Sequence, residues 1–256
     1  MNRIEQVFAD KNHKALIGFV TVGYPSIEAT LEIVPLMVKN GCDIIELGVP
    51  FSDPLAEGPI IQRSSYRAIQ NGVTLPKCLE VARELRSKVD VPLIFMGYYN
   101  PVLHCGSESF CAECAEVGID GLIIPDLPPE EGSELESLTH KYGIDLIYLL
   151  APTSEDDRID IVTERSRGFV YLVSMTGVTG SGADLPPEME NFVSKVRQKA
   201  SQPLCVGFGI TTPEQARRVA GVADGIIVGS RFIKLIEEDP TLTELQTLVR
   251  GLRQAF

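Results

Sequence analysis

A short turn followed by an apolar run recurs along this chain. Each copy reads Gly-x-Asp or Ala-Asp, and the copies are Gly41-Cys42-Asp43, Gly118-Ile119-Asp120, Gly143-Ile144-Asp145 and Ala223-Asp224. Glycine often ends a helix, and an apolar run that begins within a few residues of such a turn is typical of a buried strand. The repeat therefore predicts joints at which a helix ends and a strand begins.

Eight apolar runs fit this pattern as strands separated by helices. They cover residues 15–21, 44–47, 92–96, 122–124, 146–150, 170–173, 204–206 and 225–228. Eight strands that alternate with helices close most economically as a (β/α)8 TIM barrel, which commonly needs about 250 residues. We expect one such domain over residues 1–256. An open doubly wound sheet is the weaker alternative, because no G-x-G-x-x-G follows the first strand.

Helical patterns lie between these runs and at both ends of the chain. The main ones cover residues 26–40, 60–69, 74–88 and 108–117, and the GYYNP segment that begins at Gly97 is predicted as a loop. Residues 3–10 form a short amphipathic segment, which we expect to be an extra N-terminal helix that plugs one end of the barrel. Residues 230–237 have the length and position of a short extra helix after the last strand.

Charge and hydropathy exclude several classes of partner. Lys and Arg total 23 against 35 Asp and Glu, which gives a net charge of −12. Attraction to nucleic acid phosphates or to anionic lipid is therefore not expected. The first residues lack the apolar core of a signal peptide, and no run reaches the roughly 18 residues of a spanning helix. We expect a cytoplasmic protein.

Cysteine and histidine spacing gives no metal or disulfide signature. The six cysteines are Cys42, Cys78, Cys105, Cys111, Cys114 and Cys205. One C-x-x-C falls on a predicted helix without a second pair or a nearby histidine, so buried, reduced thiols are expected. The three histidines are scattered along the chain, which makes a catalytic zinc or a nucleophilic triad a poor hypothesis.

A carboxylate inside an apolar strand is the strongest sign of chemistry. Glu46 lies in the run 44–47, and burial of an unpaired carboxylate costs several kcal/mol. Its apolar neighbours should raise its pKa toward a range where one carboxyl both donates and accepts a proton. The structural alternative is a core acid satisfied by a hydrogen-bond network. A Gly- and Pro-rich loop follows and carries two more acids, Asp53 and Glu57.

Glycines cluster where a barrel of this class binds phosphate. Gly207-Phe208-Gly209 and Gly229-Ser230 follow the last two strands, where backbone N–H groups and a helix N-terminus can hold an anion. Glycines needed only for tight turns are the alternative. The long loop 176–187 with Gly180 and Gly182 is a candidate lid. Tyr171 could be a polar partner in the barrel or only fill it, and Asp126 could be functional or cap the helix that follows it.

Seven motifs then identify a family. They are FVTVGYPS at Phe19, IELGVPFSDPLAEGPIIQ at Ile45, GYYNPV at Gly97, PDLPPEE at Pro125, YLVSMTGVTG at Tyr171, GFGITTPEQ at Gly207 and GSRFIK at Gly229. In this order, and over nearly the whole length, the chain resembles the tryptophan synthase alpha chain family. The resemblance implies retro-aldol cleavage of indole-3-glycerol phosphate to indole and glyceraldehyde 3-phosphate. It also implies an α2β2 complex whose beta chain carries pyridoxal phosphate, with no cofactor on this chain.

The same resemblance assigns roles to individual residues. Glu46 matches the glutamate that shuttles protons at indole C3 and the glyceryl hydroxyl, and Glu57 matches the acid that holds the indole N–H. Thr179 would orient that acid. The other matches are a phosphate cradle of Gly180, Phe208, Gly209, Gly229 and Ser230, an indole pocket lined by Phe19 and Tyr171, and loop positions Pro50 and Asp53 that face the beta chain.

Glu57 departs from the family pattern, which reads PLADGP where this chain reads PLAEGP. The extra methylene moves the carboxylate by roughly 1.5 Å, and a displacement of about 1 Å can cost about 100-fold in rate. A second hypothesis is therefore a weak or inactive lyase that acts mainly as an allosteric activator of the beta chain. A third is another phosphate-binding barrel, such as a phosphoribosyl isomerase or an indole-glycerol-phosphate synthase, although its acid and base groups are expected on other strands.

Overall fold

The computed structural model describes residues 1–173, 187–207 and 209–256, whose strands form one parallel sheet. The strands are β1 (Ala15–Thr21), β2 (Ile44–Gly48), β3 (Leu93–Met96), β4 (Gly121–Ile123), β5 (Asp145–Ile147), β6 (Leu149–Leu150), β7 (Val170–Val173), β8 (Leu204–Gly207) and β9 (Gly225–Val228). They lie side by side in the order β5-β4-β3-β2-β1-β9-β8-β7-β6. The two ends of this order are consecutive in the chain, so the sheet closes into the predicted (β/α)8 barrel.

The predicted fifth strand is divided at Tyr148. Its first half, β5, pairs with β4, and its second half, β6, pairs with β7. Between them the Tyr148 N–H donates to the Ser166 hydroxyl at 3.1 Å, and the Tyr148 carbonyl accepts from the Tyr171 N–H at 3.0 Å. The backbone thus bonds to β4 before Tyr148 and to β7 after it. The described residues therefore contain nine strand segments, although the barrel has eight strands.

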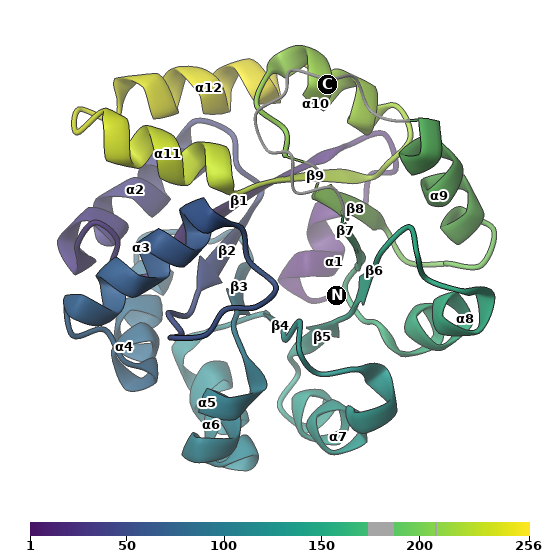
Figure 1. The fold of residues 1–256 in the computed structure, drawn as a ribbon, viewed down its shortest axis with the longest axis horizontal. Coiled ribbons are helices and arrows are strands. Elements are labelled where there is room, and N and C mark those ends of the chain that lie inside the picture. Colours follow the sequence, from purple (N-terminus) through teal and green to yellow (C-terminus); the bar gives the residue numbers. More distant parts are fainter. Residues whose placement is uncertain (174–186, 208) are drawn as a thin grey trace.

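Helices surround the strands, as Figure 1 shows. They are α1 (Arg3–Val7), α2 (Ile27–Lys39), α3 (Pro59–Gln70), α4 (Leu75–Arg86), α5 (Tyr99–Cys105), α6 (Ser107–Val117), α7 (Ser133–Lys141), α8 (Asp156–Arg165), α9 (Pro187–Arg197), α10 (Pro213–Ala220), α11 (Ser230–Glu238) and α12 (Thr243–Arg253), with a 3-10 turn η1 (Pro129–Glu131). None of the described helices is both long and apolar enough to cross a membrane.

The helix boundaries follow local capping chemistry. The Ser26 hydroxyl accepts the Ala29 N–H at the start of α2, and the Thr74 hydroxyl accepts the Lys77 N–H at the start of α4. The extra helix after the last strand is α11, as predicted. One prediction was wrong: the GYYNP segment is not all loop, because α5 begins at Tyr99, whose N–H is capped by the Asp126 carboxylate at 2.9 Å.

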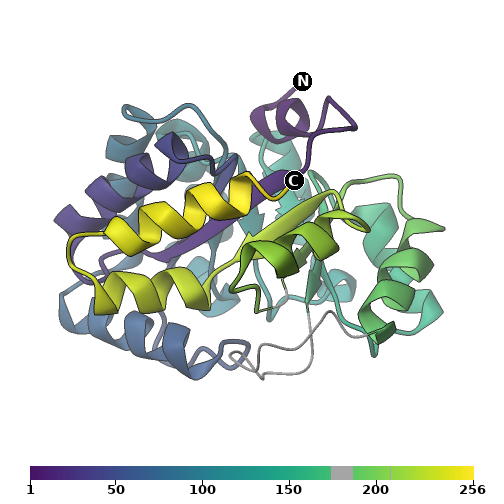
Figure 2. The same cartoon turned by 90° about the horizontal axis from the view of Figure 1, so that it is seen from above.

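The barrel interior is packed, and α1 closes one end of it. Inward-facing side chains and α1 share one apolar cluster, which contains Ile4, Ala15, Ile17, Ile44, Ile94, Ile123, Ile147, Phe169, Tyr171, Cys205 and Ile227. Ile4 is fully buried, and the rings of Phe8 and Phe169 lie 6.2 Å apart. Figure 2 shows α1 at one end of the strands. The predicted N-terminal plug is therefore confirmed.

Three of the four repeated aspartates join neighbouring strands at that same end, whereas the fourth, Asp145, accepts from the Asn2 side chain at 2.9 Å. The side chains of Asp43, Asp120 and Asp224 accept the backbone N–H groups of Leu16, Leu93 and Leu204 at 2.8 to 2.9 Å. Each aspartate precedes one strand and bonds to the start of the adjacent strand, which satisfies an N–H that the ladder leaves open. This contact gives a physical reason for the Gly-x-Asp repeat.

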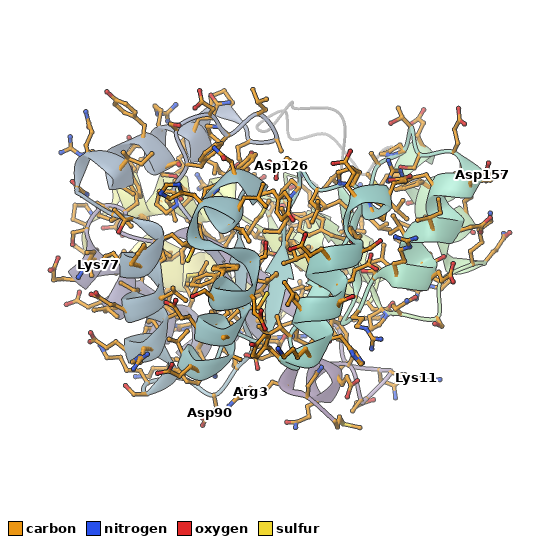
Figure 3. All side chains as sticks on the ribbon, turned by 90° about the horizontal axis from the view of Figure 1, so that it is seen from below. Arg3, Lys11, Lys77, Asp90, Asp126 and Asp157 are labelled. Carbon is orange, nitrogen blue, oxygen red and sulfur yellow. The ribbon has the colours of Figure 1, made fainter. Side chains whose placement is uncertain are left out.

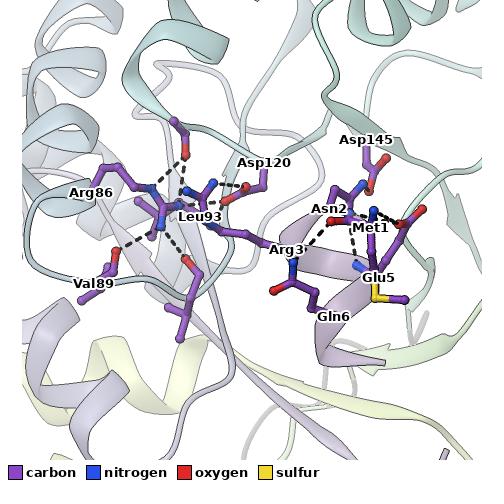
Figure 4. A network of polar contacts seen from close by, with 12 residues as sticks. Met1, Asn2, Arg3, Glu5, Gln6, Arg86, Val89, Leu93, Asp120 and Asp145 are labelled. Atoms are coloured by element: carbon purple, nitrogen blue, oxygen red, sulfur yellow. Dashed lines mark hydrogen bonds and ion pairs between the residues drawn. The ribbon is translucent and has the colours of Figure 1, made fainter. Parts of the chain in front are cut away.

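Asp120 has the least exposed side chain of these three aspartates. Its carboxylate also accepts from Arg86 at 2.8 Å and from Arg3 at 2.9 Å, so it links α4 and α1 to β3 (Figure 4). The Asp120 side chain is 8% exposed and that of Arg86 is 15% exposed, whereas that of Arg3 is 44% exposed. The bond to Arg86 is thus largely shielded from solvent, and the bond to Arg3 is not.

We predict that Asp120→Ala lowers the free energy of unfolding by about 3–5 kcal/mol, because it leaves the Arg86 charge and the Leu93 N–H without their shared acceptor. The control, Arg3→Ala, removes only the exposed partner and should cost about 0–1 kcal/mol. Urea titrations of the three proteins measure both values. Losses of equal size in the two variants would contradict the importance of the shielded contact.

Candidate active site

The candidate site lies at the carboxyl ends of the strands, opposite α1. In Figure 3, Asp126, which follows β4, lies at one end of the barrel, and Arg3 and Lys11 lie at the other. Because all the strands are parallel, their carboxyl ends share one edge of the barrel. The described site residues predicted on β1, β2, β7 and β9 therefore lie on strands whose carboxyl ends share this edge.

Glu46 is buried in the barrel interior. It lies on β2, in register with Phe19 on β1 and Ile94 on β3, and its side chain shares the inward face with that of Ile44. The residue is completely buried, and neither carboxyl oxygen has a hydrogen-bond partner among the described residues. Burial, and then the charge of Glu57, raise the pKa of Glu46 to about 8. The alternative was a core acid held by a hydrogen-bond network. No such network surrounds Glu46 in the described part of the chain.

Glu57 reaches the same region from the loop between β2 and α3. Its backbone N–H donates to the Pro54 carbonyl at 3.1 Å, and its carbonyl accepts from the Gln62 side chain at 2.9 Å. Glu57 is partly buried, and desolvation raises its pKa to about 7. The two carboxyls thus lie close enough for the charge of one to act on the other, and both titrate near neutral pH.

Phe19 lies beside two glycines that leave room for its ring. A Cβ atom at Gly48 would lie 2.4 Å from Cζ of Phe19, and one at Gly229 would lie 3.4 Å from its Cβ. A side chain at Gly48 would therefore displace the ring. Phe19 is 4% exposed and lines a cavity together with Glu57.

Tyr171 projects from β7 into the barrel interior, where it belongs to the inner apolar cluster. Burial raises its pKa, and the charges of Glu46 and then Glu57 add to that effect. A Cβ atom at Gly207 would lie 2.7 Å from its hydroxyl oxygen. The tyrosine hydroxyl thus lies near the ends of β7 and β8, in the electrostatic field of both carboxyls.

Part of the predicted phosphate cradle can be located. Gly229 is the N-cap of α11 and Ser230 its first residue, and no described side chain caps this helix. Gly209 is exposed after β8 and has φ of 48°, a left-handed conformation suited to glycine. The N-terminus of α11 therefore offers uncapped N–H groups at the carboxyl end of β9. The predicted residues Thr179, Gly180 and Phe208, and nearly all of the candidate lid, lie outside the described residues.

The positions predicted to face a partner lie on the loop that carries Glu57. Pro50 is partly buried at the start of this loop, and Asp53 is exposed. Leu55, between Asp53 and Glu57, is 92% exposed, which is unusual for a large apolar side chain. The loop thus presents polar and apolar groups to solvent within four residues of a candidate catalytic carboxyl.

Several residues at the site were not predicted. The cavity that contains Phe19 and Glu57 is also lined by Thr21, Gly48, Val49, Pro54, Ile61, Ser65, Met96 and Tyr98. Tyr98 lies in the segment predicted as a loop, and the aromatic pair Tyr98-Tyr99, one residue after a predicted strand, could have indicated it. Asp126 caps α5, which precedes it in the chain, so its predicted role as cap of the helix that follows was wrong, and its functional role stays a prediction.

Comparison with known proteins gives a consistent result. A family model described as tryptophan synthase alpha chain matches residues 6–255. A tryptophan synthase alpha chain of Dehalococcoides mccartyi is 54% identical over 256 residues and covers all of both chains. One of Geobacter sulfurreducens is 46% identical over 262 residues and covers 100% of this chain and 99% of the relative.

Solved structures agree in fold as well as in sequence. Tryptophan synthase subunit alpha from Legionella pneumophila superposes with a TM-score of 0.91 at 37% identity, covering 100% of this chain and 98% of that one. A chain of Mycobacterium tuberculosis tryptophan synthase gives a TM-score of 0.93 at 35% identity, covering 99% and 98%. Because these likenesses span the whole barrel and its carboxyl-end loops, the chain belongs to the tryptophan synthase alpha chain family.

Proposed function

We propose that this chain cleaves indole-3-glycerol phosphate to indole and glyceraldehyde 3-phosphate by a retro-aldol reaction. One observation carries the proposal: a fully buried carboxyl without a partner among the described residues, Glu46, lies near a second carboxyl, Glu57, at the carboxyl ends of the strands. Membership in the alpha chain family supports this reaction class.

The pKa of each carboxyl suits one step of that reaction. With a pKa of about 8, Glu46 is mostly protonated at neutral pH and can give its proton to indole C3. The resulting carboxylate then accepts the proton of the hydroxyl on the carbon bonded to C3. As that carbon–carbon bond breaks, its electron pair returns to the ring, which releases neutral indole and leaves an aldehyde.

Glu57 acts at the ring nitrogen in this proposal. Its pKa of about 7 leaves a large fraction ionised at neutral pH, so it can accept the indole N–H and balance the positive charge that forms when C3 is protonated. Thr179 would orient this carboxylate. Phe19 and Tyr171 would flank the indole, and backbone groups of Gly180, Phe208, Gly209, Gly229 and Ser230 would hold the phosphate.

The partner in this proposal is a tryptophan synthase beta chain, in an α2β2 complex. Pyridoxal phosphate would be bound by the beta chain, which would join the indole to serine, and this chain would need no cofactor. The loop with Pro50 and Asp53 would face the beta chain, and the exposed Leu55 supports that placement. We also propose that residues 1–256 form one domain of a cytoplasmic enzyme.

The inactive-lyase hypothesis has no observation in its favour among the described residues. Glu57 has a raised pKa, faces the same cavity as Phe19, and has its backbone held by Gln62. The backbone of Glu57 is thus fixed at the cavity, which supports an active alpha chain that uses glutamate where the family pattern has aspartate.

The variant Glu46→Gln tests the proton shuttle, because it removes the titrating proton and hardly changes the volume. Indole release, measured with the beta chain present, should fall at least about 100-fold. Binding of an indole-propanol phosphate analogue, measured by calorimetry, should stay within about threefold of the parent value. Appreciable turnover by the variant would rule out Glu46 as the proton shuttle.

The pH dependence of stability tests whether Glu46 is held neutral. In the unfolded chain its pKa is near 4.5, and in the folded chain it is about 8, so the contribution of Glu46 to stability is fully present below pH 4.5 and is lost as pH rises to 8. Relative to Glu46→Gln, the parent should therefore lose about 3 kcal/mol between pH 5 and pH 8. Urea titrations of both proteins at several pH values measure the difference. Parallel stability curves would mean that Glu46 is ionised in the folded protein.

Substitutions of Glu57 separate the active enzyme from the inactive-lyase hypothesis. The parent should release indole, Glu57→Gln should lower the rate at least about 100-fold, and Glu57→Asp should give no increase, because the shorter side chain withdraws the carboxylate by roughly 1.5 Å. The assay is again indole release with the beta chain present. An inactive parent that gains activity on Glu57→Asp would favour the activator hypothesis.

A further inference from the structure

Side chains of α3 bond to both ends of the loop that carries Glu57. The Phe51 N–H donates to the Ser65 hydroxyl oxygen, and that hydroxyl donates to the Phe51 carbonyl, both at 2.9 Å. At the far end, the Gln62 side chain donates to the Glu57 carbonyl at 2.9 Å. Both side chains lie on α3, the helix that directly follows this loop. They therefore fix the loop to the next element of the chain.

A third contact comes from a different part of the barrel. Tyr98 follows β3, and its hydroxyl oxygen accepts the backbone N–H of Ala56, directly before Glu57, at 3.0 Å. Its ring stacks on Phe51, with centroids 4.9 Å apart and an interplanar angle of 23°. Tyr98 is 6% exposed and lines the same cavity as Glu57 and Phe19. It therefore joins the loop to the barrel wall at both its start and its end.

We propose that Tyr98 is a positioning residue for Glu57, an inference that rests on the proposed function. A loop tied only to α3 could move with that helix, whereas a hydrogen bond from the end of β3 fixes the peptide before Glu57 relative to the barrel. Glutamate has one more rotatable bond than aspartate, so its carboxylate can reach more positions, and a fixed backbone removes one source of that spread.

The Tyr98 hydroxyl can also donate a hydrogen bond. It accepts from Ala56, while its own proton has no acceptor within hydrogen-bond distance among the described residues. Burial raises the pKa of Tyr98, and the charge of Glu57 is the next largest cause, ahead of Asp126, so the hydroxyl stays protonated close to that carboxylate. Tyr98 thus acts on Glu57 through the Ala56 peptide, as a neutral group that lines the same cavity.

Tyr98→Phe is the decisive variant, because it removes the hydroxyl and keeps the ring that stacks on Phe51. Assayed as indole release by the full chain with the beta chain present, kcat should fall about tenfold, with KM changed less than about threefold. Exchange of the Ala56 amide, followed by hydrogen exchange, should rise about fivefold because its acceptor is lost. Tyr66→Phe on α3, where the parent ring is 63% exposed, is the matched control and should leave kcat and Ala56 exchange at the parent values.

A double variant shows whether the effect passes through Glu57. In a Glu57→Gln background, adding Tyr98→Phe should change the residual rate by less than about twofold, since the group being positioned is already absent. A full tenfold loss in that background would overturn the proposal, as would an unchanged kcat in Tyr98→Phe alone. A parent chain that releases no indole would overturn the proposed function instead, and the Ala56 amide would then still decide whether Tyr98 holds the loop.

Discussion

A carboxyl group enclosed by an apolar barrel is the constraint on which the rest of the site depends. An ionised Glu46 would need several kcal/mol of compensation, and no described residue lies within hydrogen-bond distance of its carboxyl oxygens. The group therefore takes up a proton instead, and its pKa rises to about 8. The same enclosure that makes ionisation costly keeps a proton available at neutral pH, which is the property that acid catalysis at a carbon atom requires.

The opposite end of the barrel supports this arrangement. Aspartates such as Asp43 and Asp120 tie adjacent strands together where they begin, and α1 fills the interior below them. Water is thereby kept from the lower part of the barrel, and the strand ends keep a common register. The stability of one end and the chemistry of the other are both set by the parallel packing of the same strands.

The position of Glu57 depends on contacts from two elements. Ser65 and Gln62 hold its loop from α3, and Tyr98 holds it from the end of β3. A residue on a loop can be placed as reliably as one on a strand when its backbone is tied at several points. This gives a physical reason why a longer acid can stand where the family pattern has aspartate.

The barrel, the approximate bounds of every strand except the fifth, and the carboxyl in β2 could be predicted from the sequence, because apolar periodicity and turn residues act over a few neighbouring positions. Only the tertiary structure decided which groups meet. Nothing near Tyr98 in the chain indicates that its hydroxyl accepts the N–H of Ala56, and the cap of α5 by Asp126 joins residues 27 positions apart. The division of the fifth strand at Tyr148 likewise depends on which neighbours the closed ring supplies. Local sequence determines the elements, whereas long-range contacts form only when the ring closes and brings the strand ends together.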